Sequence, residues 1–335
     1  MNVPKLSVII PFYNASQFLR RSLDSVMKQT FKDIEVILVN DGSTDNSQDI
    51  AAEYLDSSLF VMLINIKRGG GVSKARNIGL KRARGEWVAF MDADDWVEED
   101  FYESYFKVVS SSVSCDIIFS GYIRELPLGD YRTLSLVPGY VEKKDLSKTI
   151  EYLNKTEALG WAWNKLFKRS IIEQQGIRFD PTVSLREDEL FTLMYCRHVH
   201  SIQIISDSLY HYMINDNSLV HRKRNYIDYQ RTSDLLYKEY SRYFDNEEFR
   251  KYYQQGYASG IFYALTTMYT GETKATKKQR LSFICKFLNF RSQLDIKSDI
   301  RYKANKWKNL LFKTVMSCGD VNAIDFILKF LVNRL

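Results

Sequence analysis

Four short apolar runs recur at regular distances along the first hundred residues. They span residues 6–12, 34–40, 59–65 and 87–92, and each is continuous rather than alternating in polarity. Strands covered on both faces of a parallel sheet show this continuous pattern. Between the first two runs, residues 15–29 carry apolar side chains at helical spacing. The order of strands and helices predicts an open α/β fold with a mostly parallel sheet.

Polar segments follow three of these predicted strands directly. PFYN (11–14) follows the first strand, NDGSTDNS (40–47) the second and DADD (92–95) the fourth. Turn and helix-cap chemistry alone could account for the Asn, Asp, Gly and Ser of the second segment. Open α/β sheets, however, bind ligands at the carboxyl ends of their strands. We therefore expect the three segments to form one site at one edge of the sheet.

The DADD segment ends a buried strand in the repelling carboxylates of Asp92, Asp94 and Asp95. Carboxylates this close raise one another's pKa, and a cation removes that cost. A hard divalent ion, Mg²⁺ or Mn²⁺, suits a site of one or two carboxylates completed by substrate phosphates. The alternative is a solvated helix N-terminus that begins near Trp96, where the helix dipole favours acidic residues.

A second acidic cluster, Glu187, Asp188 and Glu189, precedes an apolar pattern at helical spacing. Acidic residues in the first turn of a helix would explain it structurally. A carboxylate can also act as a general base when it lies within hydrogen-bond reach of a nucleophile. Both interpretations place the cluster at the start of a helix.

Composition and charge narrow the class of protein. The 335 residues are 45% hydrophobic, enough to bury one large core or two smaller ones. No run of about 20 apolar residues predicts a transmembrane helix. The four cysteines are far apart and form no CxxC pair, which argues against a disulfide scaffold and a structural zinc site. We expect a protein of a reducing, cytoplasmic compartment.

The charge is unevenly divided along the chain. Residues 221–335 contain 22 Lys and Arg against 11 Asp and Glu, whereas residues 1–220 contain 25 against 30. The second region also shows helical spacing dense in Tyr and Phe. We therefore expect two domains that meet different partners, one over 1–220 and a basic α-helical domain over 221–335. A solvated face, an anionic membrane surface and a protein partner are the three interpretations of this basic region.

Taken together, the segments SVIIPFYN, VNDGSTDNS, GGGVSKARNIGL and FMDADDW resemble the family 2 glycosyltransferases, over about residues 5–220. The resemblance implies a GT-A fold, a Rossmann-like nucleotide-sugar-binding domain. It implies an inverting glycosyltransferase that uses a nucleotide sugar, UDP-linked by family habit, with Mn²⁺ or Mg²⁺ as cofactor. The acceptor would be a glycan or lipid-linked glycan in cell-surface polysaccharide synthesis, reached from the cytoplasm or the inner face of the cell membrane.

The same resemblance implies roles for individual residues. Asp188 matches the catalytic base, with Glu187 as the fallback. Asp94 matches the metal ligand, Asp95 takes that role if the alignment shifts by one residue, and His221 is a further candidate ligand. The residues implied to bind the nucleotide sugar are Pro11, Tyr13, Asn14, Asp41, Arg76, Asp92 and Asp94.

Other positions match or depart from the family pattern. GWAWNKLF matches a segment beside the acceptor pocket, and we expect one of Trp161 and Trp163 to contact the acceptor and the other to pack the core. Gly69 stands where many relatives have Asn, which suggests a mobile loop. Met213 replaces an Arg, so a phosphate contact from that position is lost.

Two alternative functions belong to other classes of protein. A sugar-1-phosphate nucleotidyltransferase uses a related sheet and Mg²⁺, but it opens with a Gly-rich loop after the first strand, and PFYNASQF contains no Gly. A basic, aromatic-rich second half could bind nucleic acid. The Asp-rich edge argues against that, because phosphate backbones avoid carboxylate clusters. We expect no nucleic acid partner.

Overall fold

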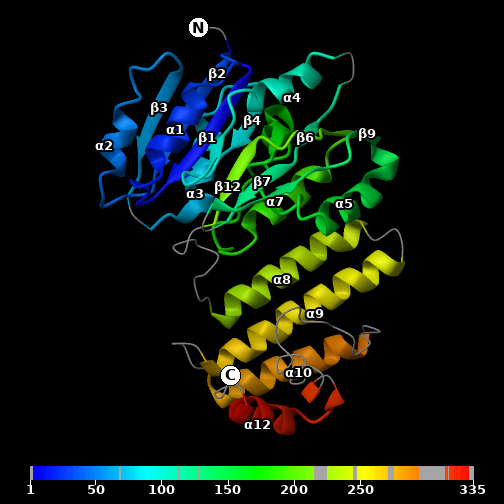
Figure 1. The fold of residues 1–335 in the computed structure, drawn as a ribbon. Helices are drawn as coiled ribbons and strands as arrows, with labels where there is room; N and C mark the ends of the chain where they lie inside the picture. Colours follow the sequence, from blue (N-terminus) through cyan, green and yellow to red (C-terminus); the bar gives the residue numbers. More distant parts are fainter. Residues whose placement is uncertain are drawn as a thin grey trace. The chain divides into compact units, whose positions relative to one another are not determined.

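The computed structural model describes residues 3–67, 69–111, 114–126, 129–214, 225–243, 247–270, 275–293, 314–315 and 317–331. The chain divides into two compact units, Met1–Ser218 and Leu219–Leu335. The first unit contains strands and helices, and the second is built of helices (Figure 1). The assignment of catalysis to 1–220 and of a separate role to 221–335 stays a prediction.

Four parallel strands form one half of the large sheet in the first unit. They are β1 (Leu6–Phe12), β2 (Ile34–Asn40), β3 (Phe60–Asn65) and β4 (Trp87–Phe90), in the spatial order β3-β2-β1-β4. Every residue of β1, β2 and β4 is buried, as their continuous apolar sequences require. The predicted α/β fold with a mostly parallel sheet is confirmed.

The sheet continues beyond β4 with shorter strands of mixed direction. The order is β4-β10-β6-β11-β9, in which β10 is antiparallel to both of its neighbours. Their bounds are β6 (Ile117–Phe119), β9 (Gly139–Glu142), β10 (Lys165–Lys168) and β11 (Ser201–Ile204).

Helices connect and cover these strands (Figure 1). Helix α3 packs directly against β1 and β2, and a Cβ atom on its Gly79 would lie 2.4 Å from Ile9 Cγ2. The glycine therefore permits the close approach of helix and sheet. The helices of this unit are α1 (Leu19–Met27), α2 (Ser47–Ala52), α3 (Gly71–Arg82), α4 (Phe101–Val109), α5 (Leu146–Lys155), α6 (Arg169–Gln174) and α7 (Glu187–Cys196).

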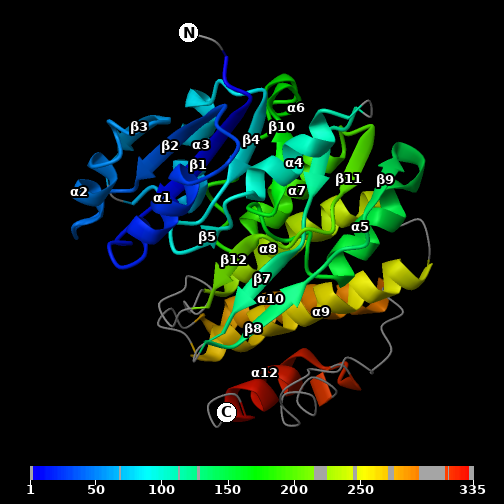
Figure 2. The same cartoon turned by 45° about the horizontal axis from the view of Figure 1, so that its top comes forward.

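A second, smaller sheet completes the first unit. It has the order β5-β12-β7-β8, with β5 (Trp96–Val97), β12 (Tyr210–Met213), β7 (Tyr122–Glu125) and β8 (Tyr131–Leu134). Strands β12, β7 and β8 lie side by side in Figure 2. Because β5 follows the DADD segment at once, this sheet connects the predicted metal site with the hairpin of β7 and β8.

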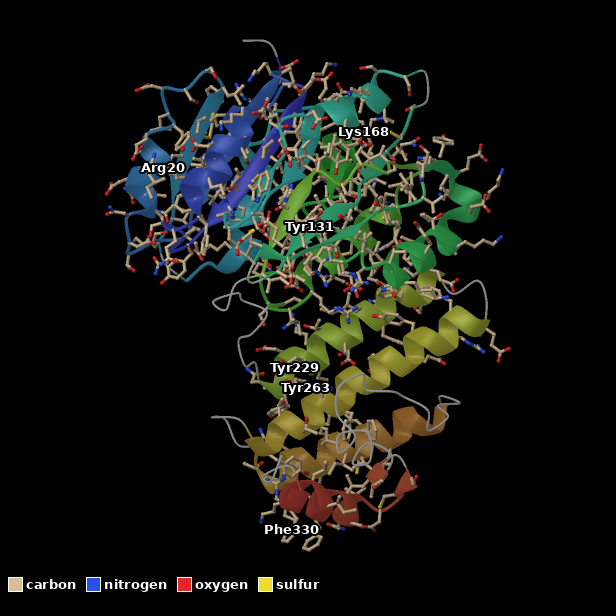
Figure 3. The ribbon with its side chains drawn as sticks, viewed as in Figure 1. Arg20, Tyr131, Lys168, Tyr229, Tyr263 and Phe330 are labelled. Atoms are coloured by element: carbon tan, nitrogen blue, oxygen red, sulfur yellow. The ribbon has the colours of Figure 1, made fainter. Side chains whose placement is uncertain are left out.

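The second unit contains α8 (Tyr226–Tyr240), α9 (Glu247–Thr270), α10 (Lys277–Gln293) and α12 (Val321–Leu331). Tyr229 of α8 and Tyr263 of α9 meet edge to face with ring centroids 4.7 Å apart (Figure 3). The buried carboxylate of Asp325 in α12 accepts hydrogen bonds from Tyr269 and Arg280, at 2.7 Å each. These contacts confirm the predicted helical C-terminal region. Among the described residues, no helix has the length and apolar character to cross a membrane.

Candidate active site

The loops after β1 and β2 interlock at the carboxyl edge of the large sheet. The backbone N–H of Asn14 donates to Ser43 Oγ at 3.0 Å, and that of Thr44 donates to Asn14 Oδ1 at 2.8 Å. Asn14 has a φ of 50°, the left-handed region that Asn tolerates better than most residues. The structure thus brings the PFYN and NDGSTDNS segments together, as the sequence predicts.

Asp41 fastens the N-terminus of α3 to this edge. Its two carboxylate oxygens accept hydrogen bonds from the backbone N–H groups of Gly70 and Gly71, at 3.0 and 2.8 Å. A Cβ on Gly70 would lie 2.8 Å from Asp41 Oδ1, so a larger residue here would displace the Asp41 carboxylate. Gly69 and Gly71 have φ values of 101° and 71°. The glycine run therefore lets the backbone turn onto Asp41, whose role in nucleotide-sugar binding stays a prediction.

Arg76 of α3 joins the two acidic clusters. Its Nη2 donates to Asp92 Oδ1 at 2.9 Å and its Nη1 to Glu187 Oε1 at 3.1 Å. Burial alone would lower the pKa of Arg76, but the carboxylates of Asp92 and Glu187 hold it above its ordinary value. This buried guanidinium fixes the end of β4 against the start of α7. The predicted nucleotide contact of Arg76 is a separate hypothesis.

Asp95 is fully buried, and its carboxylate connects the DADD turn to β12. It accepts hydrogen bonds from Tyr210 Oη at 2.6 Å and from the backbone N–H of Met213 at 2.8 Å. Burial, together with the charges of Asp94 and Asp92, raises the pKa of Asp95 well above its ordinary value. The carboxyl group of Asp95 therefore links the DADD turn to β12 through these two hydrogen bonds.

Asp94 is the half-buried carboxylate between these two neighbours. Its neighbour Asp92 accepts a hydrogen bond from Arg76, and Asp95 accepts one from the backbone N–H of Met213. The role of Asp94 as a metal ligand stays a prediction. Among the described residues, no three His, Cys, Asp or Glu side chains converge into a complete metal site. A hard cation held by one or two carboxylates would need a ligand's phosphates to complete its coordination. The other candidate ligand, His221, lies outside the described residues.

Asp188 lies in the first turn of α7, and Oδ1 of its carboxylate accepts the backbone N–H of Glu189 at 3.0 Å. Burial and the neighbouring charge of Glu187 raise the pKa of Asp188 to about 8, although Arg76 opposes the shift. Glu189 is occupied by Arg186, whose Nη2 lies 2.7 Å from Glu189 Oε1. The role of Asp188 as the catalytic base stays a prediction.

The two tryptophans of GWAWNKLF occupy different environments. Trp163 is buried and stacks on Tyr210, with ring centroids 4.2 Å apart and planes 9° apart. Trp161 is half-buried and lies 5.2 Å from the ring of Tyr212. Trp163 therefore packs the core. Trp161 stacks on Trp163 with ring centroids 5.5 Å apart, and an acceptor contact by either ring stays a prediction.

Lys165 holds the loop that carries Trp161. Its fully buried Nζ donates to the carbonyl oxygens of Ala158, at 2.9 Å, and of Trp161, and to Asn164 Oδ1 at 2.6 Å. Burial lowers the pKa of Lys165 to about 7. One side-chain amine therefore donates to three acceptors in residues 158–164 and holds this segment of the chain together.

Replacing Lys165 with Met is therefore expected to lower the free energy of unfolding by about 2–4 kcal/mol, because buried acceptors lose their donor. Urea titration followed by circular dichroism measures this change. Lys148→Met is the matched control, because Lys148 is exposed on α5 and should leave the midpoint unchanged. Equal stability of Lys165→Met and the wild type would contradict the structural role of Lys165.

Some residues that the fold brings to this region carry no recognisable signal in the sequence. The ring of His211 stacks on Trp96, with centroids 3.6 Å apart, and lies between Glu98 and Glu125. The carboxylates of Glu98 and Glu125 come from segments distant from His211 in sequence. Only strand pairing across β5, β12 and β7 brings them together, and no local motif signals it.

Comparison with known proteins agrees with this geometry. Residues 7–176 match the family model described as Glycosyl transferase family 2. The uncharacterized glycosyltransferase EpsJ of Bacillus subtilis (strain 168) is 32% identical over 223 residues, which cover 65% of this chain and 63% of EpsJ. Poly(ribitol-phosphate) beta-N-acetylglucosaminyltransferase TarP of Staphylococcus aureus (strain N315) is 31% identical over 242 residues, 70% of this chain and 71% of TarP.

Coverage of the relatives is partial. The matched part spans 63% of EpsJ, 64% of the putative glycosyltransferase EpsH of Bacillus subtilis (strain 168) and 31% of glycosyltransferase GlyA of Streptococcus pneumoniae serotype 4 (strain ATCC BAA-334 / TIGR4).

Two solved structures share the fold. S. aureus TarS 1–349 in complex with UDP-GlcNAc aligns with a TM-score of 0.66 at 18% identity, covering 98% of this chain and 92% of that chain. The mannosyltransferase PcManGT from Pyrobaculum calidifontis, in complex with GDP-Man and Mn²⁺, aligns with a TM-score of 0.53 at 14% identity, covering 98% and 88%. At these identities the likeness shows a common architecture.

Proposed function

The chain belongs to glycosyltransferase family 2, and we propose that it transfers a sugar from a UDP-linked donor to a glycan or lipid-linked glycan, inverting the anomeric carbon. The observation that carries this proposal is the pairing of two acidic clusters across Arg76, one at the end of β4 and one at the start of α7. The relative TarP is named for transfer of N-acetylglucosamine to poly(ribitol-phosphate), and TarS was solved with UDP-GlcNAc. The TarS complex supports a UDP-sugar as donor, and the name of TarP supports a polymeric acceptor.

The donor would lie along the carboxyl ends of β1, β2 and β4. Pro11, Tyr13, Asn14 and Asp41 are proposed to line the nucleotide pocket. Asp94 would hold Mn²⁺ or Mg²⁺, which supplies positive charge to the departing diphosphate. The Mn²⁺ in the PcManGT structure supports a metal of this class.

In the proposed reaction, Asp188 removes the proton from the acceptor hydroxyl as its oxygen attacks the anomeric carbon. The bond from that carbon to the diphosphate oxygen breaks, and its electron pair leaves with the nucleoside diphosphate. One displacement from the opposite face converts an α-linked donor into a β-glycoside. Arg76 would contribute by holding Glu187 and Asp92 in place through its two ion pairs.

The raised pKa of Asp188 predicts a pH profile. The base acts in its deprotonated form, so kcat should rise about tenfold per pH unit up to about pH 8 and then level off. Initial rates of UDP release under saturating donor and acceptor measure this profile. A kcat that stays constant from pH 6 to 8 would contradict a base with this pKa.

The proposed function is tested by incubating the protein with a panel of UDP-sugars and Mn²⁺, and detecting free UDP. We expect UDP release from one or a few UDP-sugars, and none in EDTA. UDP release at equal rates in EDTA, or no release from any donor, would contradict the metal-dependent proposal.

The second unit is proposed to contact an anionic membrane surface. On α12, Phe326 and Phe330 are 70% and 53% exposed, and their rings lie nearly parallel with centroids 6.3 Å apart (Figure 3). Lys329 is exposed beside them. Exposed aromatic rings next to a basic side chain are typical of interfacial helices.

A further inference from the structure

A basic cavity of about 280 Å³ opens in the first unit between the β7–β8 hairpin and the C-terminal end of α5. Three of its lining residues are cationic, namely Arg124 of β7, Arg132 of β8 and Lys155 of α5. Tyr122 and Glu157 also line it. The proposed donor and base chemistry uses none of these side chains.

The two arginines lie directly opposite each other across the hairpin. Arg124 pairs with Arg132 in the antiparallel register of β7 and β8, so both side chains project from the same face. Like charges directly opposite each other destabilise a sheet. An anion bound between the two guanidinium groups would remove this repulsion.

The protein itself neutralises the positive charges of this cavity only in part. Nη2 of Arg124 donates to Glu157 Oε2 at 3.0 Å and to Tyr122 Oη at 3.2 Å, while its buried Nε has no partner among the described residues. Lys155 is paired with Glu151 at 2.6 Å. Arg132 is exposed, and its side chain forms no ion pair within the described part of the chain. Its guanidinium can therefore bind a phosphate or carboxylate through two parallel hydrogen bonds.

Packed aromatic rings connect this cavity to the carboxylate cluster. Tyr122 meets Trp163 edge to face at 4.9 Å, Trp163 stacks on Tyr210 at 4.2 Å, and Tyr210 donates to Asp95. In the next strand, Tyr212 is the direct register partner of Arg124. The cavity therefore lies on the same small sheet as the DADD turn, two strands away from β5.

We propose that this cavity binds an anionic group, phosphate or carboxylate, carried by the acceptor at a position away from the reacting hydroxyl. The inference rests on the proposed glycosyl transfer, because only that reaction gives the chain an acceptor. It predicts that charged acceptors are preferred over neutral ones of the same size.

The test is a titration of the full chain at low ionic strength with glycerol 3-phosphate, glucuronate and glycerol, followed by tryptophan fluorescence. We expect saturable binding of at least one of the two anions and none of glycerol. Tighter binding of glycerol 3-phosphate identifies a phosphate site, and tighter binding of glucuronate identifies a carboxylate site. Arg132→Ala should weaken the anion affinity about tenfold or more.

Arg82→Ala is the matched control, since Arg82 is an exposed arginine near the end of α3 and does not line the cavity. It should bind the anion like the wild type. An equal loss of anion affinity in Arg82→Ala and Arg132→Ala would overturn the assignment of the anion site to this cavity. Release of the bound anion by UDP would overturn it as well.

A separate UDP titration in Mn²⁺ distinguishes the two proposals. Binding of UDP without binding of either anion refutes the cavity assignment alone. Binding of the anion without UDP refutes the proposed function and leaves an anion site that serves no acceptor.

Discussion

Replacing Asp188 with Asn should reduce sugar transfer by about 10²- to 10⁴-fold while leaving UDP affinity unchanged. The amide keeps the shape of the side chain but cannot take the proton of the acceptor hydroxyl. The structure places Asp188 at the start of α7, where burial and Glu187 raise its pKa to about 8. Steady-state rates with the preferred UDP-sugar and calorimetric UDP titration measure the two quantities.

The stability of the same variant separates catalysis from folding. The folded pKa of Asp188, about 8, lies above the ordinary 3.8, so its stabilising effect is present at low pH and is lost as the pH rises through about 8. At about pH 9 the Asn variant should therefore be at least as thermally stable as the wild type. A normal rate of sugar transfer by Asp188→Asn would exclude Asp188 as the base. If Glu187→Gln lost sugar transfer instead, the role of base would go to Glu187.

Replacing Asp94 with Asn should abolish the metal dependence of UDP binding. Asp94 is half-buried and is the proposed protein ligand of the cation, so the substitution removes a carboxylate oxygen that a hard cation prefers. We expect UDP affinity in Mn²⁺ to fall at least about 10- to 100-fold, to the value measured in EDTA. Calorimetry with and without Mn²⁺ gives both numbers.

Asp95→Asn is the comparison variant for this prediction. Asp95 is buried and accepts from Tyr210 and Met213, so its substitution should lower thermal stability and leave the metal dependence of UDP binding in place. The reverse pattern, with metal dependence intact in Asp94→Asn and lost in Asp95→Asn, would move the metal ligand to Asp95.

The sequence predicted the α/β fold because its signal is local. The run of residues 6–12 is apolar throughout, and the strand it forms is buried at every position. The polar segments after β1 and β2 likewise meet at the carboxyl edge of the sheet, as expected for neighbouring parallel strands. The hydrogen bonds of Asn14 to Ser43 and Thr44 show this.

The environment of each acidic residue was not predictable in the same way. Asp94 and Asp95 are adjacent in sequence, and only the hydrogen bonds from β12, more than a hundred residues later, distinguish the buried carboxyl from the accessible one. The same holds for Trp161 and Trp163, whose burial depends on Tyr210 and Tyr212. These contacts depend on the register of distant strands, which no local pattern encodes.

The basic cavity illustrates the same limit. Arg124 and Arg132 lie in an unremarkable stretch of sequence, and the hairpin register alone makes them neighbours. To predict that the two arginines lie opposite each other, one would have to predict both strands and their exact register. Such non-local pairings are the part of a binding site that a single sequence specifies least.

The anomeric configuration of the product tests the central claim most directly. With the UDP-sugar that the donor panel selects, proton NMR recorded during the first turnovers distinguishes α- from β-linked product. A single displacement assisted by Asp188 predicts a β-glycoside from an α-linked donor. An α-glycoside would contradict that mechanism and the role of Asp188 in it.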